Sequence, residues 1–255
     1  MLTNQYPSLK DKTVFVSGGG SGIGASLVEA FSRQGAAVAF VDIQEAESLA
    51  LVERLQQEEN TGPVRFHPCD LTDIEELQRV IASVGEELGP ISVLVSNAAN
   101  DKRHDFREVT PEQWDKCLAV NLRHQFFAAQ AVYPQMKGLG GGSIINLGSM
   151  SWHAGQGGMP GYTSSKAAIE GLTRGLARDM GPDRIRVNTL VPGWVMTEKQ
   201  LRLWVDDAAR AEIERGQSMK GELLPDHIAA MALFLASDDS CMCTAQNFIV
   251  DGGWI

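Results

Sequence analysis

Short apolar runs alternate with helix-length segments along the whole chain of 255 residues, and this alternation restricts the fold more than any other feature. Strands separated by helices form βαβ units, in which the strands lie parallel and the helices cover both faces of the sheet. Runs that are apolar throughout, with many β-branched residues, are typical of strands buried on both faces. The sequence therefore predicts an α/β protein with one doubly wound parallel sheet.

Seven strands and six main helices are expected from these runs. The strands are predicted at residues 13–18, 37–42, 64–70, 91–98, 142–149, 185–193 and 247–253. The helices are predicted at residues 23–35, 45–60, 73–88, 111–136, 161–180 and 225–237. Because no stretch rich in Pro, Gly or Ser is long enough to separate domains, residues 1–255 are predicted to form a single cofactor-binding and catalytic domain.

Composition argues against several classes of function. The formal net charge is −10, and an acidic surface repels a phosphate backbone, so nucleic-acid binding is not expected. No apolar run has the length of a membrane span, and the N-terminal stretch "MLTNQYPSLKDK" lacks the apolar core of a secretory signal. The spacing of Cys69, Cys117, Cys241 and Cys243 fits neither a disulfide framework nor a zinc site. We expect reduced thiols, no metal and a cytoplasmic protein.

The stretch "SGGGSGIG" at residues 17–24 follows the first predicted strand and opens the first predicted helix. Glycine permits positive φ and close approach of the backbone to a pyrophosphate, and the free N–H groups of a helix N-terminus point at the phosphates. A glycine-rich turn also occurs in ordinary βα connections, but its position favours a dinucleotide site of the Rossmann type. Cofactor contacts are expected from Gly18, Ser21, Gly22, Ile23 and Gly24.

Asp42 ends the second strand, 18 residues after Gly24, near the spacing at which an acidic residue binds the adenosine ribose hydroxyls. Its charge would repel the 2′-phosphate of NADP, and neither Ile43 nor Gln44 offers a cation. NAD is therefore the predicted cofactor. The ends of the third and fourth strands add expected contacts to the adenine and the nicotinamide ribose, from Asp70, Leu71, Asn97, Ala98 and Ala99.

Tyr162 and Lys166 lie four residues apart in a predicted helix and therefore share one face. Oxidation of an alcohol by hydride transfer needs a base for the hydroxyl proton, and free tyrosine, with a pKa near ~10, is a poor base at neutral pH. We expect the Lys166 ammonium, with the positive nicotinamide ring, to lower the pKa of Tyr162. Ser149, thirteen residues before Tyr162, is expected to hydrogen-bond the substrate oxygen, and Ser151 is the alternative.

These motifs, in this order, resemble the short-chain dehydrogenase/reductase family over nearly the whole chain. The matching pieces are "SGGGSGIG", Asp70, "NAA" at 97–99, Asn121, Ser149, Tyr162 with Lys166, and "PGWVMT" at 192–197. The resemblance implies that Asn121 holds a proton-relay water, that Lys166 contacts the nicotinamide ribose, and that the protein is a homotetramer. By itself, Asn121 could equally be a helix residue bonded to backbone. Further cofactor contacts are implied for Pro192, Gly193, Val195 and Thr197.

The segment at about 194–222, after the sixth strand, is expected to be the substrate lid. It is rich in charges and tryptophans, whereas a steroid or a fatty acyl chain would suit a long apolar lid. An indole can stack on the apolar face of a sugar ring, and the sugar hydroxyls need several polar partners. Asn100 stands where the family usually has glycine, and it either faces the substrate or forms a turn. Substrate contacts are predicted from Asn100, Ser149, Trp152, His153, Gln156, Tyr162 and Trp194.

Stretches such as "HDFREVTPEQWDKCLAVNLRHQFFAAQAV" and "PGWVMTEKQLRLW" are similar to the bacterial sugar 1-dehydrogenases of this family. This narrower resemblance implies oxidation of an aldopyranose of the L-fucose, L-arabinose or D-galactose type at C1 to the lactone. A 3-oxoacyl-thioester reductase or another short-chain alcohol dehydrogenase is the alternative, although the reductase would normally want NADPH and a basic patch for its carrier protein. A non-catalytic nucleotide-sensing protein is a third possibility, which the intact Tyr162 and Lys166 disfavour.

Overall fold

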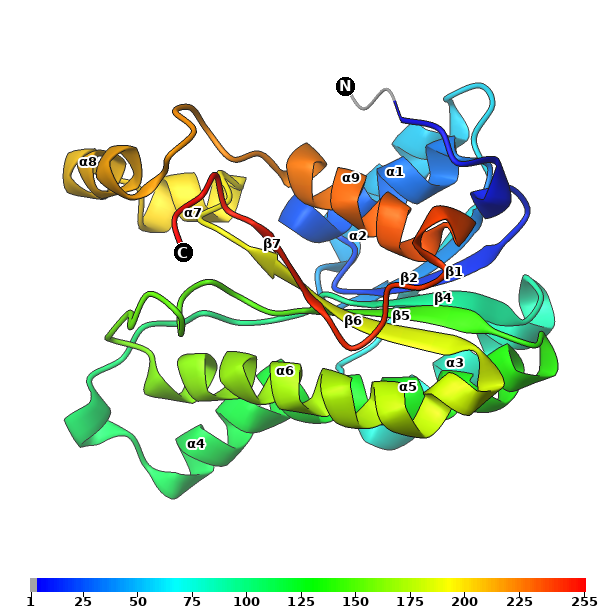
Figure 1. Ribbon diagram of the computed structural model, residues 1–255, viewed down its shortest axis with the longest axis horizontal. Helices are drawn as coiled ribbons and strands as arrows, with labels where there is room; N and C mark the ends of the chain where they lie inside the picture. Colours follow the sequence, from blue (N-terminus) through cyan, green and yellow to red (C-terminus); the bar gives the residue numbers. More distant parts are fainter. Residues whose placement is uncertain (1–3) are drawn as a thin grey trace.

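The computed structural model describes residues 4–255, and its strands form one parallel sheet (Figure 1). The first three residues of the predicted domain and of the N-terminal stretch lie outside the described part. The strand order is β3-β2-β1-β4-β5-β6-β7, so the predicted doubly wound sheet is confirmed. Its strands are β1 (Thr13–Ser17), β2 (Ala37–Asp42), β3 (Val64–Pro68), β4 (Ile91–Ser96), β5 (Gly142–Leu147), β6 (Ile185–Pro192) and β7 (Asn247–Val250).

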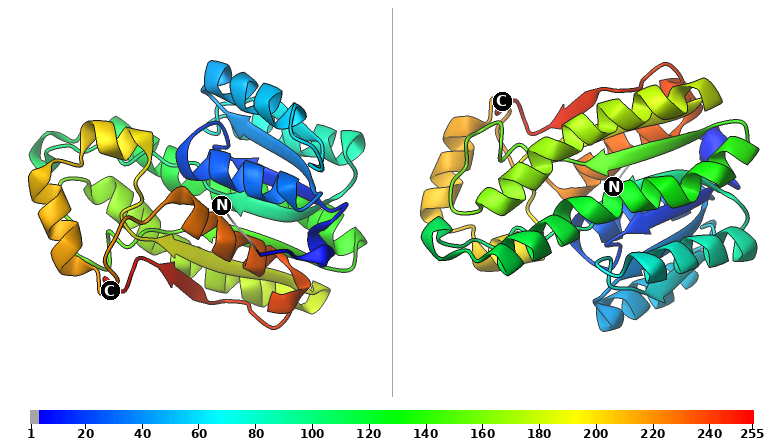
Figure 2. Two further views of the ribbon diagram at one scale, coloured as in Figure 1. Left: turned by 90° about the horizontal axis from the view of Figure 1, so that it is seen from above. Right: turned by 90° about the horizontal axis from the view of Figure 1, so that it is seen from below.

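Helices cover both faces of this sheet, as Figure 2 shows from above and below. One face carries α1 (Gly22–Arg33), α2 (Glu45–Gln56) and α9 (Pro225–Ala236). The other face carries α3 (Ile74–Glu87), α5 (His124–Gly138) and α6 (Pro160–Met180). Successive side chains of a strand point to opposite faces, so β1 sends Val14 and Val16 into one apolar core and Phe15 into the other.

The chain reverses its winding between β1 and β4, which lie side by side although two other strands separate them in sequence. Ligands of open parallel sheets bind in the crevice outside the carboxyl ends of the strands, at such a switch point. Most strands end one to three residues earlier than the sequence predicted, because the last residues of each apolar run already belong to the loops at this crevice. The topology therefore brings the turn after β1 next to the loop after β4.

The predicted long helix 111–136 contains a π-helical turn that sequence analysis missed. The helix begins as α4 (Pro111–Leu118), passes through the π-helical turn η3 (Ala119–Arg123) and continues as α5. Thr110 caps the beginning: its side chain accepts from the Gln113 N–H, and the Gln113 side chain accepts in return from the Thr110 N–H. A π-helical turn contains an extra residue, which changes the direction of the side chains that follow.

The predicted lid contains two helices, α7 (Glu198–Leu203) and α8 (Asp207–Gly216), that charge pattern alone did not indicate. Each begins with a side-chain cap, since Thr197 accepts from the Gln200 N–H and Asp206 accepts from the Ala209 N–H. In Figure 1 the two helices project beyond the carboxyl ends of β6 and β7. Within residues 4–255, no helix combines the length and the apolar character needed to cross a membrane.

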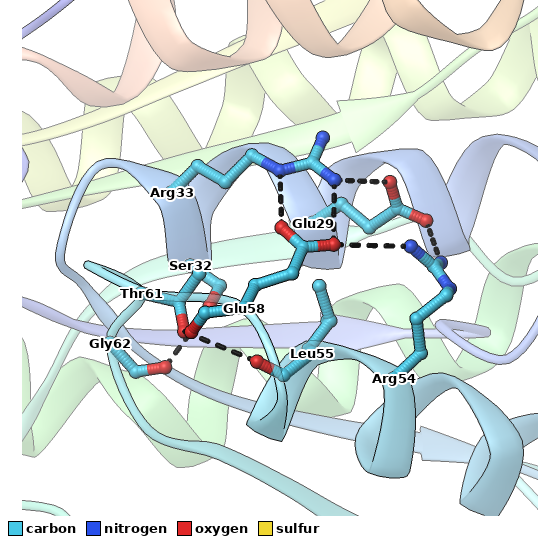
Figure 3. Close-up of polar contacts among 8 residues, drawn as sticks. All are labelled: Glu29, Ser32, Arg33, Arg54, Leu55, Glu58, Thr61 and Gly62. Carbon is cyan, nitrogen blue, oxygen red and sulfur yellow. Dashed lines mark hydrogen bonds and ion pairs between the residues drawn. The ribbon is translucent and has the colours of Figure 1, made fainter.

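Four short 3₁₀ helices complete the described secondary structure: η1 (Pro7–Leu9), η2 (Phe106–Glu108), η4 (Gly181–Asp183) and η5 (Asp238–Ser240). On the face of the sheet that carries α1 and α2, ion pairs join the two helices (Figure 3). Arg33 donates two hydrogen bonds of 2.9 Å to Glu58, and Arg54 contacts both Glu29 and Glu58. These groups are exposed, so the network contributes little stability beyond fixing the two helices relative to each other.

Candidate active site

A cavity of about 1540 Å³ opens at the carboxyl ends of the strands, beneath the lid. Its volume exceeds the range of roughly 300–1,000 Å³ of a pocket for one small ligand, so it has room for a large cofactor and a substrate together. The loops after β1, β2, β3, β4, β5 and β6 line it. The predicted cofactor residues in its lining are Gly18, Ser21, Gly22, Ile23, Gly24, Asp42, Asp70, Leu71, Asn97, Ala98, Ala99, Tyr162, Lys166, Pro192, Gly193, Val195 and Thr197.

The turn after β1 requires glycine at three of its positions. Gly18 and Gly22 have φ of +68° and +55°, in the left-handed region that favours glycine. A Cβ on Gly24 would lie 1.8 Å from the Gly18 carbonyl oxygen, and a Cβ on Gly18 would lie 2.8 Å from the Ala98 Cα. This packing keeps the turn open and presents the N-terminus of α1 to the cavity. A pyrophosphate group fits such a cradle of bare backbone.

The Asp42 carboxylate is buried and ordered at the end of β2. One of its oxygens accepts from the Gly20 N–H at 2.8 Å, and the other accepts from the Gln44 N–H at 2.9 Å. Gln44 also donates to the Ser21 hydroxyl at 3.0 Å, which joins this carboxylate to the glycine-rich turn. The turn and the carboxylate together fit a dinucleotide: bare backbone for the phosphates and an acceptor for ribose hydroxyls.

Ser17 and Asn97 join the glycine-rich turn to the loop after β4. The Ser17 hydroxyl accepts from the N–H groups of Asn97 and Ala98 at 3.0 and 3.2 Å. The Asn97 amide donates to the carbonyl groups of Ser17 and Gly18 at 3.1 and 2.8 Å. Sequence analysis assigned Asn97 only to the cofactor and gave Ser17 no role. The hydroxyl at position 17, directly before the first glycine, was the signal that pointed to it.

Asn121 lies in the π-helical turn, is buried and does not line the cavity. Its Oδ1 accepts from the Asn100 N–H at 2.8 Å, and its Nδ2 donates to the carbonyl groups of Cys117 and Asn100 at 3.0 and 3.2 Å. Asn121 thus holds the backbone of the loop after β4, which was the alternative left open by the sequence. Asn100 lines the cavity, but its side chain accepts from the Lys102 N–H in a turn.

His124 is a site residue that sequence analysis missed. It is completely buried, and its Nε2 lies 3.2 Å from the Ala98 carbonyl oxygen. Burial, followed by the charge of Lys166, lowers the pKa of His124 to about 4, so the ring is neutral at physiological pH. A neutral Nε2–H can donate to Ala98 and hold the loop that lies against the cofactor. The only signal in the sequence was its position three residues after Asn121.

Tyr162 and Lys166 lie one turn apart on α6, as predicted, and both face the cavity. The Lys166 Nζ donates to the Leu147 carbonyl at 2.7 Å and lies 5.5 Å from the centre of the Tyr162 ring. Ser149 and Ser151 lie beside the tyrosine, joined by a hydrogen bond of 3.0 Å between their hydroxyl groups. The structure therefore brings together the predicted catalytic side chains Ser149, Tyr162 and Lys166, with Asn121 behind them.

Burial dominates the titration of this group. It raises the pKa of Tyr162 to about 12, against the lowering effect of a hydrogen bond with Ser149, and it lowers the pKa of Lys166 to about 7. In the protein alone, the pKa of Tyr162 is therefore raised and not lowered, and the lowering by Lys166 together with the nicotinamide ring stays a prediction for the complex. Removal from water disfavours phenolate and ammonium alike.

The predicted substrate residues divide into two groups. Gln156 and Trp194 line the cavity with Ser149 and Tyr162. Trp152 and His153 do not, because both turn outward to α6, where their ring nitrogens lie 3.1 and 2.8 Å from Glu170 Oε1. The assignment of Trp152 and His153 to the substrate is corrected accordingly: they hold the loop after β5 against α6. Asp101 and Arg103 line the cavity and were not assigned from the sequence.

A parallel sheet that holds a glycine-rich turn beside a half-buried tyrosine and a buried lysine defines a nucleotide-dependent oxidoreductase. The family model described as "Enoyl-(Acyl carrier protein) reductase" matches residues 18–255 of the chain. The chain belongs to the short-chain dehydrogenase/reductase family, as its motifs predicted. Dehydrogenases of this family use a nicotinamide cofactor, and the glycine-rich turn and Asp42 fit such a group.

Two sugar dehydrogenases are among the most similar proteins. "D-xylose 1-dehydrogenase" of Caulobacter vibrioides is 47% identical over 98% of both chains. "Probable galactose dehydrogenase" of Rhizobium meliloti is also 47% identical over 98% of both chains. More distant is "D-threitol dehydrogenase" of Mycolicibacterium smegmatis, which is 34% identical over 96% of this chain and 94% of its own. These similarities confirm the narrower resemblance to bacterial sugar 1-dehydrogenases.

Solved structures agree on the fold. A short-chain type dehydrogenase/reductase from Mycobacterium ulcerans has a TM-score of 0.92 and 26% identity, covering 97% of this chain and 90% of its own. A 3-oxoacyl-[acyl-carrier protein] reductase from Brucella melitensis has a TM-score of 0.89 and 28% identity, covering 99% of this chain and 97% of its own. One scaffold thus supports different substrates, so the substrate must be argued from the site.

Replacing Gly24 with alanine should weaken cofactor binding about tenfold or more, because its Cβ would lie 1.8 Å from the Gly18 oxygen and the turn would have to shift. Calorimetric titration with the cofactor measures the dissociation constant. Gly138→Ala is the matched control, since an added Cβ there meets nothing within 4 Å. Equal dissociation constants for G24A and the wild type would contradict this role of the turn.

His124 should make the protein less stable in acid. Between its folded pKa of about 4 and its ordinary value of 6.5, the unfolded chain binds more protons than the folded one. The free energy of unfolding should therefore rise by a few kcal/mol, roughly, as the pH rises through this window, and fall as the pH is lowered. Urea unfolding at a series of pH values measures the slope.

His124→Asn should flatten that slope, whatever its effect on absolute stability. His227→Asn, at an exposed position, is the matched control and should leave the slope unchanged. Parallel curves for H124N and the wild type would show that His124 does not carry the dependence.

Proposed function

We propose that this protein oxidises the C1 hydroxyl of an aldopyranose to the lactone, with NAD as cofactor and Tyr162 as general base. The observation that carries the proposal is the position of Ser149, Tyr162 and Lys166 in the lining of one cavity, which Trp194 and Gln156 also line. Two relatives that share 47% of their residues with this chain are named for D-xylose and for galactose.

The side chains divide the chemical work between them. The hydroxyl group of Ser149 holds the substrate oxygen beside Tyr162, and the phenol oxygen of Tyr162 takes the hydroxyl proton. Lys166 Nζ lies 5.5 Å from the centre of the tyrosine ring and has hydrogens free to donate to a ribose hydroxyl besides the bond to Leu147. A bound nicotinamide supplies the hydride acceptor. Asn121 and His124 fix the loop on which the substrate and cofactor meet.

Asp42 supports NAD over NADP. Its carboxylate accepts hydrogen bonds from two backbone N–H groups and can accept more from a ribose diol, whereas a 2′-phosphate would meet like charge. The neighbouring cavity-lining residues are Ile43, Gln44 and Glu47, none of which is a cation. Arginine or lysine at these positions would be expected in a site built for the extra phosphate.

The cavity lining supports a polar, ring-shaped substrate. Trp194 offers a flat apolar surface for the C–H face of a sugar, while Gln156 and Arg103 offer hydrogen-bonding groups for its hydroxyls. This distribution of apolar face and polar edge matches a monosaccharide better than a steroid or an acyl chain.

The alternatives are weaker on specific grounds. A 3-oxoacyl-thioester reductase shares the fold, as the Brucella melitensis structure shows, but it would need to attract an acidic carrier protein to a chain of net charge −10. Another short-chain alcohol dehydrogenase, of the kind that the threitol enzyme represents, would keep the same chemistry with an open-chain polyol. A non-catalytic nucleotide sensor would have no use for the full group of Ser149, Tyr162 and Lys166.

We infer further that the protein is a cytoplasmic homotetramer, as the family resemblance implies. Trp114 on α4 and Phe126 on α5 are 36% and 39% exposed, which suits a helix surface that packs against another subunit. Light scattering on the purified protein tests the assembly, and a monomer at micromolar concentration would overturn it.

A panel of aldoses tests the function directly. Aldopyranoses such as D-xylose, D-galactose, L-arabinose and L-fucose should reduce NAD at pH values near neutrality, with lower rates for NADP. Formation of NADH is followed by absorbance and the lactone by its reaction with hydroxylamine. Turnover of a non-sugar alcohol with silence on every aldose would overturn the sugar assignment, and a preference for NADP would overturn the role given to Asp42.

Tyr162→Phe should abolish most of the oxidation rate while leaving cofactor binding within about twofold, because general base catalysis contributes a factor of about 10²–10⁴. The wild-type rate should rise with pH, since burial holds the pKa of Tyr162 at about 12 and the phenolate fraction grows toward that value. Tyr133→Phe, which removes a hydroxyl bonded to Asp183 away from the cavity, is the control. Full activity in Y162F would exclude Tyr162 as the base.

A further inference from the structure

Two segments that are far apart in sequence meet over the substrate end of the cavity. One is the loop after β4, residues 100–104, and the other is the stretch from Trp194 to Trp204, which contains α7. The contacts between them are made by side chains and not by a shared sheet or helix. The position of the lid over the cavity therefore depends on a small number of polar and aromatic contacts.

The central contact is a bridge of three side chains. Gln200 Nε2 donates to Asp101 Oδ2 at 2.7 Å, and Gln200 Oε1 accepts from Trp194 Nε1–H at 3.1 Å. A carboxylate can only accept and an indole N–H can only donate, so the partners allow just one orientation of the Gln200 amide. Asp101 thereby determines which end of Gln200 faces the tryptophan.

Other contacts reinforce the bridge on both sides. Lys199 pairs with Asp101 Oδ1 at 2.6 Å, and the Arg103 guanidinium lies 4.5 Å from the ring centre of Trp204 and 5.9 Å from that of Trp194. Burial acts to raise the pKa of Asp101, but the hydrogen bond and charge of Lys199 with the hydrogen bond of Gln200 lower it overall. Asp101 therefore stays ionised, and able only to accept hydrogen bonds, to a lower pH than an ordinary aspartate.

We propose that Asp101, acting through Gln200, is a positioning residue that holds the Trp194 ring over the cavity and so sets the affinity for the substrate. This inference rests on the proposed function in that Trp194 is taken as the surface on which the sugar stacks. An indole held in one orientation binds a ring without first losing its own rotational freedom. A loosened indole adds that entropic cost to every binding event, while the hydride step, which depends on Ser149, Tyr162 and Lys166, is unaffected.

Gln200→Glu tests the bridge, because it places a second carboxylate against Asp101. The KM for the sugar should rise about threefold to tenfold, with kcat within about twofold of the wild type. The double variant D101N/Q200E should restore the KM, since the introduced amide can donate to the introduced carboxylate, which still accepts from Trp194. Arg210→Gln is the control and should change neither constant. It breaks an exposed ion pair of the lid, in which Arg210 lies 3.2 Å from Glu222, and Arg210 does not line the cavity.

Hydrogen exchange over residues 194–204 gives a readout that needs no substrate. Exchange should be faster in Q200E and return to the wild-type rate in D101N/Q200E, which also shows that both variants are folded. An unchanged KM in Q200E, or a double variant that stays as impaired as Q200E, would overturn the inference even if exchange changes.

The two proposals can fail separately. If the wild-type enzyme oxidises a non-sugar alcohol and no aldose, the proposed substrate class is overturned, and the same series is measured with that alcohol. Restoration of its KM by the double variant then supports the bridge as a positioning device, and no restoration overturns it.

Discussion

The burial of the Lys166 ammonium is the constraint on which the site depends. A charged group that is 1% exposed needs partners, and the Leu147 carbonyl at the end of β5 provides one at 2.7 Å. That bond sets where α6 must lie relative to β5, and it places Tyr162 one turn earlier, beside Ser149. Burial and, after it, the charge of Lys166 lower the pKa of His124, which stays neutral and holds Ala98. Burial also raises the pKa of Tyr162, so Ser149 is the side chain whose hydrogen bond favours the phenolate.

Much of the fold could be predicted because its information is local. The bounds of β2, Ala37–Asp42, match the predicted run, because the polar turns on either side of this apolar stretch determine where the strand begins and ends. The glycine-rich turn could also be predicted from the sequence, because Gly18 and Gly22 adopt the positive φ that glycine permits. The helical spacing of Tyr162 and Lys166 needed only the period of an α-helix, and their roles as base and neighbouring charge followed from the chemistry of alcohol oxidation. The family resemblance added the contact of Lys166 with the nicotinamide ribose.

What could not be predicted depends on contacts between distant residues. The π-helical turn at Ala119–Arg123 has no signature in an apolar helix sequence, yet it contains Asn121, which bonds the backbone of Asn100. Trp152 and His153 lie near Ser149 in sequence, but both side chains hydrogen-bond Glu170 on α6 and therefore point away from the cavity. The direction of the Tyr162 pKa shift depends on how much protein surrounds the ring, and the spacing of residues in the sequence does not predict this burial.

The two ends of the cavity are built from different structural elements. This difference explains how related enzymes can share one reaction and act on different substrates. The cofactor end consists of backbone cradles and buried side chains, where a change at Gly24 or Asp42 meets atoms on every side. The substrate end consists of half-buried side chains on two loops, Asp101 and Arg103 on one and Trp194 on the other. Loop side chains tolerate replacement far better than packed backbone. Replacement of loop side chains would therefore change the substrate while the cofactor end stays intact, which is consistent with relatives at 47% identity that are named for different sugars, xylose and galactose.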